Sequence, residues 1–339
     1  VTGFECIETG LPYNTPVTAV NRNPLYTKLV NTGFKFDVVA VGTGGSVATG
    51  YTGSVNVELY DDSSAPVCSS AVAIAGSTQA LSFLASDNGR KTITTNMSLT
   101  NAYGKLRCRV RESSGSSPVT ACSSDSFTVR PTAITSITSS ANADSLGTSN
   151  TNTPIIKTGV NFSLNADTNT VGYNGTPNID ANLLEWTNVP STGLVPPGTG
   201  NLAGAFTTAA NSSTGNGANG ISFTYDEVGY FRFKVQGVYD NTFAANSDDI
   251  LNGDCTNDAS NTLVGGKYGC KFGNTSVSNY FGRFVPDHFT LALSSYAEPC
   301  TGFAYMDQPF SLTATIEGRN SSNSRTVNYS GVFGRATVT

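Results

Sequence analysis

Histidine and charge are scarce in this sequence. His288 is the only histidine of 339 residues, and Lys, Arg, Asp and Glu together make up 13% of them. Zinc sites are excluded because the cysteines lack the spacing of zinc ligands and His288 is the only histidine. A single histidine also leaves a Ser-His triad one candidate base, whose place at a domain junction favours a packing role. The net charge of −5 argues against a nucleic-acid partner, which normally requires a clustered basic surface.

Long apolar runs are also missing. No stretch approaches the roughly 20 apolar residues that span a bilayer, and the first residues lack the basic and apolar regions of a signal peptide. Because Val1 is not an initiator and Thr339 interrupts a repeat, we expect a piece of a longer protein. Gly, Ser, Thr and Asn are abundant instead, without a convincing amphipathic helix, and this composition favours strands and tight turns.

A segment of alternating apolar residues, followed by a Tyr-x-Gly turn, occurs three times. Repetition at domain-sized spacing indicates a tandem array, and a period of two indicates antiparallel sheets with one buried face. We therefore predict an all-β fold of tandem immunoglobulin-like β-sandwich domains. The three copies are residues 36–40 with 51–53, 162–166 with 173–175, and 310–314 with 329–331.

Turn signals and composition changes predict the domain boundaries. In the first sandwich, Val55, Val57 and Leu59 alternate with polar residues and should face the core. In the second, residues 190–220 form a long loop, the first candidate for a contact surface. The turn at residues 225–230 is typical of the corner where a chain crosses between sheets. The expected order is a lead-in at 1–24, a sandwich at 25–131, a connection at 132–154, a sandwich with long loops at 155–284, and the start of a third domain at 285–339.

Seven cysteines, none in a CxxC pair, indicate disulfides and an oxidising compartment. Cys255 and Cys270 close a short loop and form the best-supported pair. Cys122 can bond Cys68 or Cys108, and strand phase favours Cys68 because it puts Cys108 and Cys122 on opposite faces. The cysteines without an assigned partner are Cys6, Cys108 and Cys300, and one of Cys6 and Cys300 is expected to bond outside this chain.

One loop concentrates oxygen ligands next to Cys255. These side chains could coordinate calcium, which takes six to eight oxygens. Their spacing does not follow the EF-hand order, and a solvated, turn-rich loop is the favoured interpretation. No other cofactor is expected, and the loop is the second candidate contact surface. The candidate ligands are Asp248, Asp249, Asn252, Asp254 and Asp258.

Residues 282–289, with segments at 121–131, 225–230 and 300–310, resemble the C-terminal region of the MshQ-like family. That family is associated with biogenesis of the mannose-sensitive haemagglutinin type IV pilus. The resemblance implies a bacterial, secreted or cell-surface protein with no catalytic residues. Its most distinctive part comprises Arg283, Phe284, Pro286, Asp287, His288 and Phe289.

These observations predict a non-enzymatic adhesin or stalk protein on the outside of the cell. Its expected partners are pilus or other surface-fibre proteins, copies of itself, or a glycan or surface receptor. One alternative is a fibre subunit that assembles by strand addition, because an incomplete third sandwich would leave an open sheet edge. Another is a calcium-dependent glycan-binding module.

Overall fold

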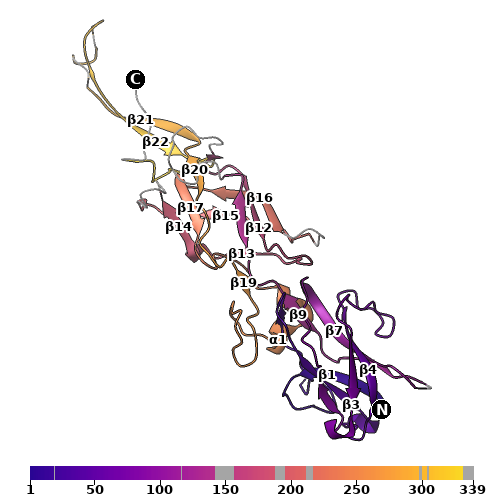
Figure 1. The fold of residues 1–339 in the computed structure, drawn as a ribbon. Helices are drawn as coiled ribbons and strands as arrows, with labels where there is room; N and C mark the ends of the chain where they lie inside the picture. Colours follow the sequence, from indigo (N-terminus) through magenta and orange to yellow (C-terminus); the bar gives the residue numbers. More distant parts are fainter. Residues whose placement is uncertain are drawn as a thin grey trace.

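The computed structural model describes residues 1–18, 20–115, 117–141, 156–187, 195–210, 217–297, 300–303 and 305–330. Two β units follow one another along an elongated molecule, and a long hairpin projects from the far end (Figure 1). The predicted all-β sandwich class is confirmed, since strands dominate the described residues. The described helices are short: η1 (Thr43–Gly45), η2 (Ala85–Asp87), η3 (Ala181–Leu183), η4 (Phe243–Ser247) and α1 (Asp249–Asn252).

The first unit packs a three-stranded sheet against a six-stranded sheet. The side chains of Val55, Val57 and Leu59 are fully buried between them, as their alternation predicts. The smaller sheet has the order β1 (Gly3–Glu8), β3 (Phe36–Val41), β6 (Arg90–Thr92). The larger has the order β2 (Lys28–Leu29), β9 (Phe127–Arg130), β7 (Tyr103–Glu112), β4 (Gly53–Asp61), β5 (Gln79–Phe83), with β8 (Thr120–Cys122) also paired to β7.

The expected lead-in at residues 1–24 is wrong. Residues 3–8 form β1, which pairs antiparallel with β3 so that Cys6 lies opposite Val38. Phe4 and Cys6 are buried in the core. The physical reason is that without β1 one edge of the buried strand β3 would expose unpaired backbone groups.

The second unit also packs two sheets, around a core rich in aromatic rings that includes Phe162, Phe231 and Phe284. One sheet has the order β10 (Ser136–Ser139), β12 (Phe162–Asp167), β16 (Gly217–Tyr225), β15 (Leu202–Ala203). The other has the order β11 (Ile156–Lys157), β20 (Phe281–Val285), β17 (Gly229–Phe233), β14 (Leu184–Thr187). A small third sheet consists of β13 (Asn178–Ile179), β18 (Val238–Asp240) and β19 (Phe272–Gly273).

Two predicted irregular segments are partly ordered in sheets. Within the connection expected at 132–154, β10 pairs with β12, while residues 142–154 lie outside the described part. Within the loop expected at 190–220, β15 pairs with β16, and Phe206 is buried in the core. Residues 190–194 and 211–216 of that loop lie outside the described part. Both segments contain too few apolar residues to show the alternation of a strand. Each nevertheless supplies a strand at the edge of a sheet.

The third unit is the hairpin of β21 (His288–Ala297) and β22 (Ser311–Arg319), drawn in yellow-orange in Figure 1. Leu291 lies opposite Ile316, and Phe289 lies opposite Gly318. In the described part of the chain these two strands pair only with each other. Their apolar side chains are therefore largely exposed, with Leu291 at 66%.

The structure gives a physical reason for the repeated Tyr-x-Gly turn. A methyl group on Gly53 would lie 2.7 Å from the Tyr51 hydroxyl oxygen, and one on Gly175 would lie 2.5 Å from Cε2 of the Tyr173 ring. In both units the tyrosine folds back over the glycine two residues later. It then donates a hydrogen bond to a carboxylate: Tyr51 to Glu112 at 3.0 Å, and Tyr173 to Asp240 at 2.5 Å.

Replacing Gly175 with alanine should therefore destabilise the second unit. The added methyl group would collide with the Tyr173 ring and with the Asp240 carboxylate, and overpacking of this kind costs about 1–3 kcal/mol. Urea unfolding monitored by tyrosine and tryptophan fluorescence would measure the loss. Gly50→Ala is the matched control, because no atom lies within 4 Å of its added methyl group. Equal unfolding midpoints for the two variants would contradict this explanation of the turn.

Candidate functional site

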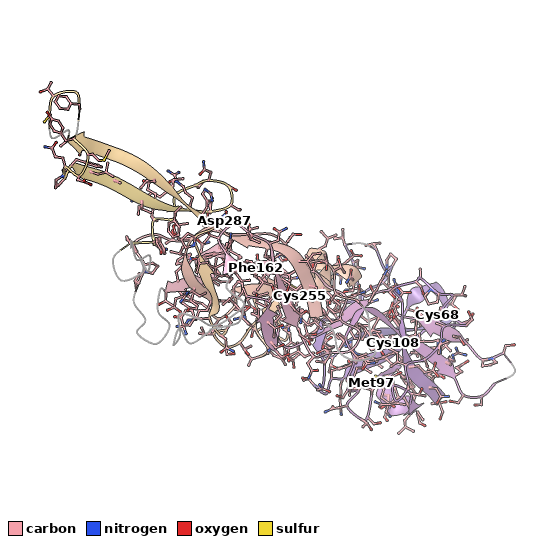
Figure 2. All side chains as sticks on the ribbon, turned by 90° about the horizontal axis from the view of Figure 1, so that it is seen from above. Cys68, Met97, Cys108, Phe162, Cys255 and Asp287 are labelled. Carbon is pink, nitrogen blue, oxygen red and sulfur yellow. A yellow bond between two sulfur atoms is a disulfide. The ribbon has the colours of Figure 1, made fainter. Side chains whose placement is uncertain are left out.

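The junction between the two sandwiches is built by residues 243–271, a segment of the second unit. Its helix η4 packs against β7 and β9 of the first unit. The Ser247 hydroxyl is 2.7 Å from the Thr128 hydroxyl, and the Ser126 hydroxyl donates to the Ser247 carbonyl oxygen at 3.2 Å. Cys255 marks this segment between the two units in Figure 2. Residues far apart in the sequence thus join the units through buried polar contacts.

Asp249 is the polar centre of this junction. Its carboxylate is fully buried and accepts hydrogen bonds from the Thr27 hydroxyl, the Ser247 hydroxyl and, at 3.1 Å, the Thr128 backbone N–H. Burial raises the pKa of Asp249 to about 7, and these hydrogen bonds oppose the rise. The side chain therefore ties Thr27, β9 and η4 together.

Asp254 makes a second contact across the junction. Its carboxylate forms an ion pair with Arg22 at 2.5 Å, and Arg22 also reaches Asp125 at 3.0 Å. Burial and then the neighbouring Asp125 raise the pKa of Asp254 to about 7. The Thr27 backbone N–H donates to the Asp254 carbonyl oxygen at 3.3 Å. The first unit thus holds both the side chain and the backbone of this residue.

The structure does not gather the five candidate calcium ligands. Asp249 and Asp254 are buried against the first unit, whereas Asp248, Asn252 and Asp258 are exposed. Among the described residues, no cluster of three or more His, Cys, Asp or Glu side chains is arranged to hold a metal ion. The candidate ligands thus do not form one site, because packing against the first unit turns the carboxylates of Asp249 and Asp254 to different partners. The favoured solvated loop is corrected at these two residues, which are buried.

Arg130 is the second buried centre of the junction. It ends β9 and its side chain is fully buried. The guanidinium donates to the carbonyl oxygens of Gly269 at 2.7 Å, Pro131 at 2.7 Å and Ser260 at 2.9 Å, and to the Asn261 side-chain oxygen at 3.0 Å. It also lies 5.8 Å from the centre of the Phe272 ring. Burial lowers the pKa of Arg130 to about 10.

The loop that surrounds Arg130 is closed by a disulfide. Cys255 and Cys270 are bonded with their Cα atoms 5.0 Å apart, and Gly269, Ser260 and Asn261 lie between them. The bridge limits how far these acceptors can move. We call Arg130, Asp249 and the loop 255–270 the interdomain clamp. Sequence reasoning misses it, because nothing in the residues around Arg130 indicates which segment will cover that side chain.

The other cysteines lie in the first unit and in the hairpin. Cys68 bonds Cys122, and together with Cys255–Cys270 this is the pairing that strand phase and loop length favour. Cys6 bonds Cys108 between β1 and β7, a pair that the misplaced lead-in hid. Cys300 forms no disulfide in the structure. Three disulfides place the chain outside the reducing cytoplasm.

Residues 283–289 connect the second unit to the hairpin. Phe284 is buried in the aromatic core, while Asp287, labelled in Figure 2, stands at the base of β21. The Asp287 carboxylate accepts from His288 Nδ1 at 2.9 Å and pairs with Lys157 at 3.3 Å, and these partners lower its pKa. His288 Nε2 lies 3.2 Å from the Asn323 side-chain oxygen.

The other residues of the segment 283–289 also hold the attachment point of the hairpin. The Asp287 backbone N–H donates to the Arg319 carbonyl oxygen at 2.8 Å. Pro286 lies against Gly318, where an added methyl group would come within 3.0 Å of the proline ring. Arg283 belongs to β20, and Phe289 packs on Tyr329 with ring centres 5.2 Å apart. The motif thus fixes how the hairpin leaves the second unit.

Comparison with solved structures finds two much longer chains. The native conformation of Escherichia coli alpha-2-macroglobulin matches with a TM-score of 0.23 and 15% identity, over 82% of this chain and 18% of that chain. The same protein activated by porcine elastase matches with a TM-score of 0.22 and 14% identity, over 88% of this chain and 24% of that chain. This chain therefore spans less than a quarter of either macroglobulin chain, and such low TM-scores carry no functional argument.

Sequence comparisons point to one family domain. No curated protein matches, and among the described residues no helix has the length and apolar character to cross a bilayer. The matched family region begins at Glu227, in the turn between β16 and β17, and so includes the clamp loop and the hairpin. Residues 227–339 match the third domain of the DUF6701 family.

Proposed function

We propose that this chain is a non-enzymatic stalk and adhesion module of a bacterial cell surface, associated with type IV pili as the family resemblance implies. A stalk must hold its domains at a fixed spacing. The interdomain clamp carries the proposal because it buries Arg130 and Asp249 at the junction and gives each several hydrogen-bond partners. Rotation of one unit against the other would break all of these bonds together.

Two further features support a load-bearing surface protein. The first sandwich contains two disulfides, and the second carries the loop closed by Cys255–Cys270. These bridges limit unfolding outside the cell. The units are arranged end to end rather than side by side (Figure 1). His288, the one histidine, is engaged by Asp287 and Asn323 at the hairpin base, a structural environment rather than that of a general base.

A second candidate function is assembly of chains through the hairpin. Phe289, Leu291, Leu312 and Ile316 of the paired strands are about half exposed or more. An isolated two-stranded hairpin is marginally stable in water, so an apolar face of this kind favours a covering partner. The occupant we consider is a strand from a second copy of the chain, added to the hairpin by β-pairing.

Scattering measurements on the purified chain separate the two candidates. A stalk should remain monomeric by light scattering as concentration rises, and its small-angle X-ray profile should fit one fixed arrangement of the units. Assembly predicts a mass that increases with concentration, and Leu291→Lys should abolish the increase. Val72→Lys, at an exposed valine of the first unit, is the control. A flexible monomer would contradict both candidates, and immunogold labelling of intact bacteria would test the surface location.

A further inference from the structure

A polar groove lies beside the interdomain clamp, between the two sandwiches. Its volume is about 350 Å³, within the range of small-molecule sites. The first unit contributes Asn101, Tyr103 and Lys105 to its walls, and the second contributes Asn174 and Asn246. Neither unit forms the groove alone, because the first unit supplies the lining residues between 61 and 105 and the second supplies those between 171 and 246.

The floor of the groove is held by direct backbone contact. The Ala102 N–H donates to the Val171 carbonyl oxygen at 2.8 Å. Gly172 has a φ of +88°, and a side chain there would collide with the Ala102 carbonyl oxygen. On the other side, Asn246 lies against Gly104 so closely that a methyl group on Gly104 would come within 2.7 Å of its amide nitrogen. The groove is therefore preformed, which lowers the entropic cost of binding.

The chemistry of the walls selects a ligand that both donates and accepts hydrogen bonds. In the described part of the chain the exposed side-chain amides of Asn174 and Asn246 form no hydrogen bond, so each offers a carbonyl oxygen and an NH₂ group. Tyr103 adds a partly buried aromatic ring and hydroxyl. Neighbouring amides and an aromatic surface match the hydroxyl groups and the C–H faces of a sugar ring.

Charge in the groove is balanced. Lys105 lies 3.5 Å from the carboxylate of Asp62, which also pairs with Arg107. The Asp61 carboxylate accepts from the Ser63 backbone N–H at 2.9 Å. An anionic ligand would thus find no unpaired cation among these groups. A peptide added as a strand is disfavoured as well, because β7 already pairs with β4 on one side and with β8 and β9 on the other.

We propose that this interdomain groove binds a short, uncharged saccharide without a metal ion. This proposal rests on the proposed adhesive function, for which it specifies the class of ligand. It also implies that binding depends on the clamp, since the clamp sets the distance between the Tyr103 wall and the Asn174 wall. A saccharide bridging both walls would in turn favour the clamped arrangement.

The test is saturation-transfer NMR on the intact chain with glucose, galactose, N-acetylglucosamine and their disaccharides cellobiose, lactose and chitobiose, followed by calorimetry for those that bind. Asn246→Ala and Asn174→Ala each remove one amide and keep the Cβ atom. Each should weaken binding at least about tenfold, the effect of losing one to two hydrogen bonds. Asn96→Ala, at an exposed asparagine of the first unit that belongs to neither the groove nor the clamp, should bind like wild type. EDTA should have no effect.

Each of the following results would overturn the inference. They are the absence of transfer from every sugar, unchanged affinity in both groove variants, and loss of binding on chelation. Peptide binding at the groove without sugar binding would also overturn it, and would assign a different ligand class. None of these results affects the scattering test of a rigid monomer, so failure of the saccharide site and failure of the stalk are distinguishable.

Discussion

Replacing Arg130 with methionine should loosen the junction and cost roughly 3 kcal/mol of stability, the effect of leaving several buried acceptors unpaired. Methionine preserves much of the apolar stem but donates no hydrogen bonds. The carbonyl oxygens of the buried Gly269 and the half-buried Ser260 would then lack their donor, and the exposed side chain of Asn261 would lose its bond to the guanidinium. The loop 255–270 would stay closed by its disulfide but would no longer be attached to β9.

Hydrogen exchange and small-angle scattering would show this loss in different ways. Exchange should accelerate at Gly269 and Cys270, whose N–H groups donate within the loop, and the scattering profile should require more than one arrangement of the units. Arg325→Met is the matched control, because Arg325 is exposed and its nearest carboxylate is 3.7 Å away. If Arg130→Met unfolds at the wild-type midpoint and scatters as one body, the clamp does not determine the arrangement.

Patterns among neighbouring residues predict those features of the fold that depend only on neighbouring residues. The alternation of Val55, Val57 and Leu59 identifies the buried face of β4, because a strand in a sandwich has one solvent-exposed face and one face in the core. The pairing of Cys255 with Cys270 follows similarly from a short loop. Residues 3–8 lack this signal, since four of their six side chains are buried and the strand alternates little. Once β1 was missed, Cys6 had no assigned place and its bond to Cys108 could not be predicted.

The candidate site was not predictable because it depends on how the two units meet. Asp249 and Asp254 occur in a sequence that is typical of a solvated loop, and their oxygen atoms suit calcium as well as they suit hydroxyl and guanidinium groups. Only the docking of η4 on β9 buries them and selects the second set of partners. The same holds for Arg130, since all of its acceptors except Pro131 lie 130–139 residues away. Tertiary contacts therefore determine the chemistry of this loop.

The stability of the junction should fall as the pH rises from about 4 to about 7. Burial raises the pKa of Asp249 and of Asp254 from the ordinary 3.8 to about 7. Between these values the folded chain binds more protons than the unfolded chain, so raising the pH favours unfolding. The stabilisation that proton binding gives to the folded chain is complete below the pKa that these carboxyl groups have in the unfolded chain. It is lost as the pH rises through their pKa in the folded chain. For the fully buried Asp249 it is on the order of 2–4 kcal/mol.

Asp249→Asn should remove about half of this pH dependence and leave the chain more stable than wild type near pH 8. The asparagine has the shape of the protonated carboxyl group. Its oxygen can accept from Thr27 and the Thr128 N–H, while its NH₂ group can donate to the Ser247 hydroxyl. Urea unfolding from pH 4 to pH 8 would measure the slope, and Asp248→Asn, the same change at the exposed neighbour, should leave it unaltered. A variant less stable than wild type at every pH would instead mean that the junction requires the ionised carboxylate, held by its three donors against the cost of burial.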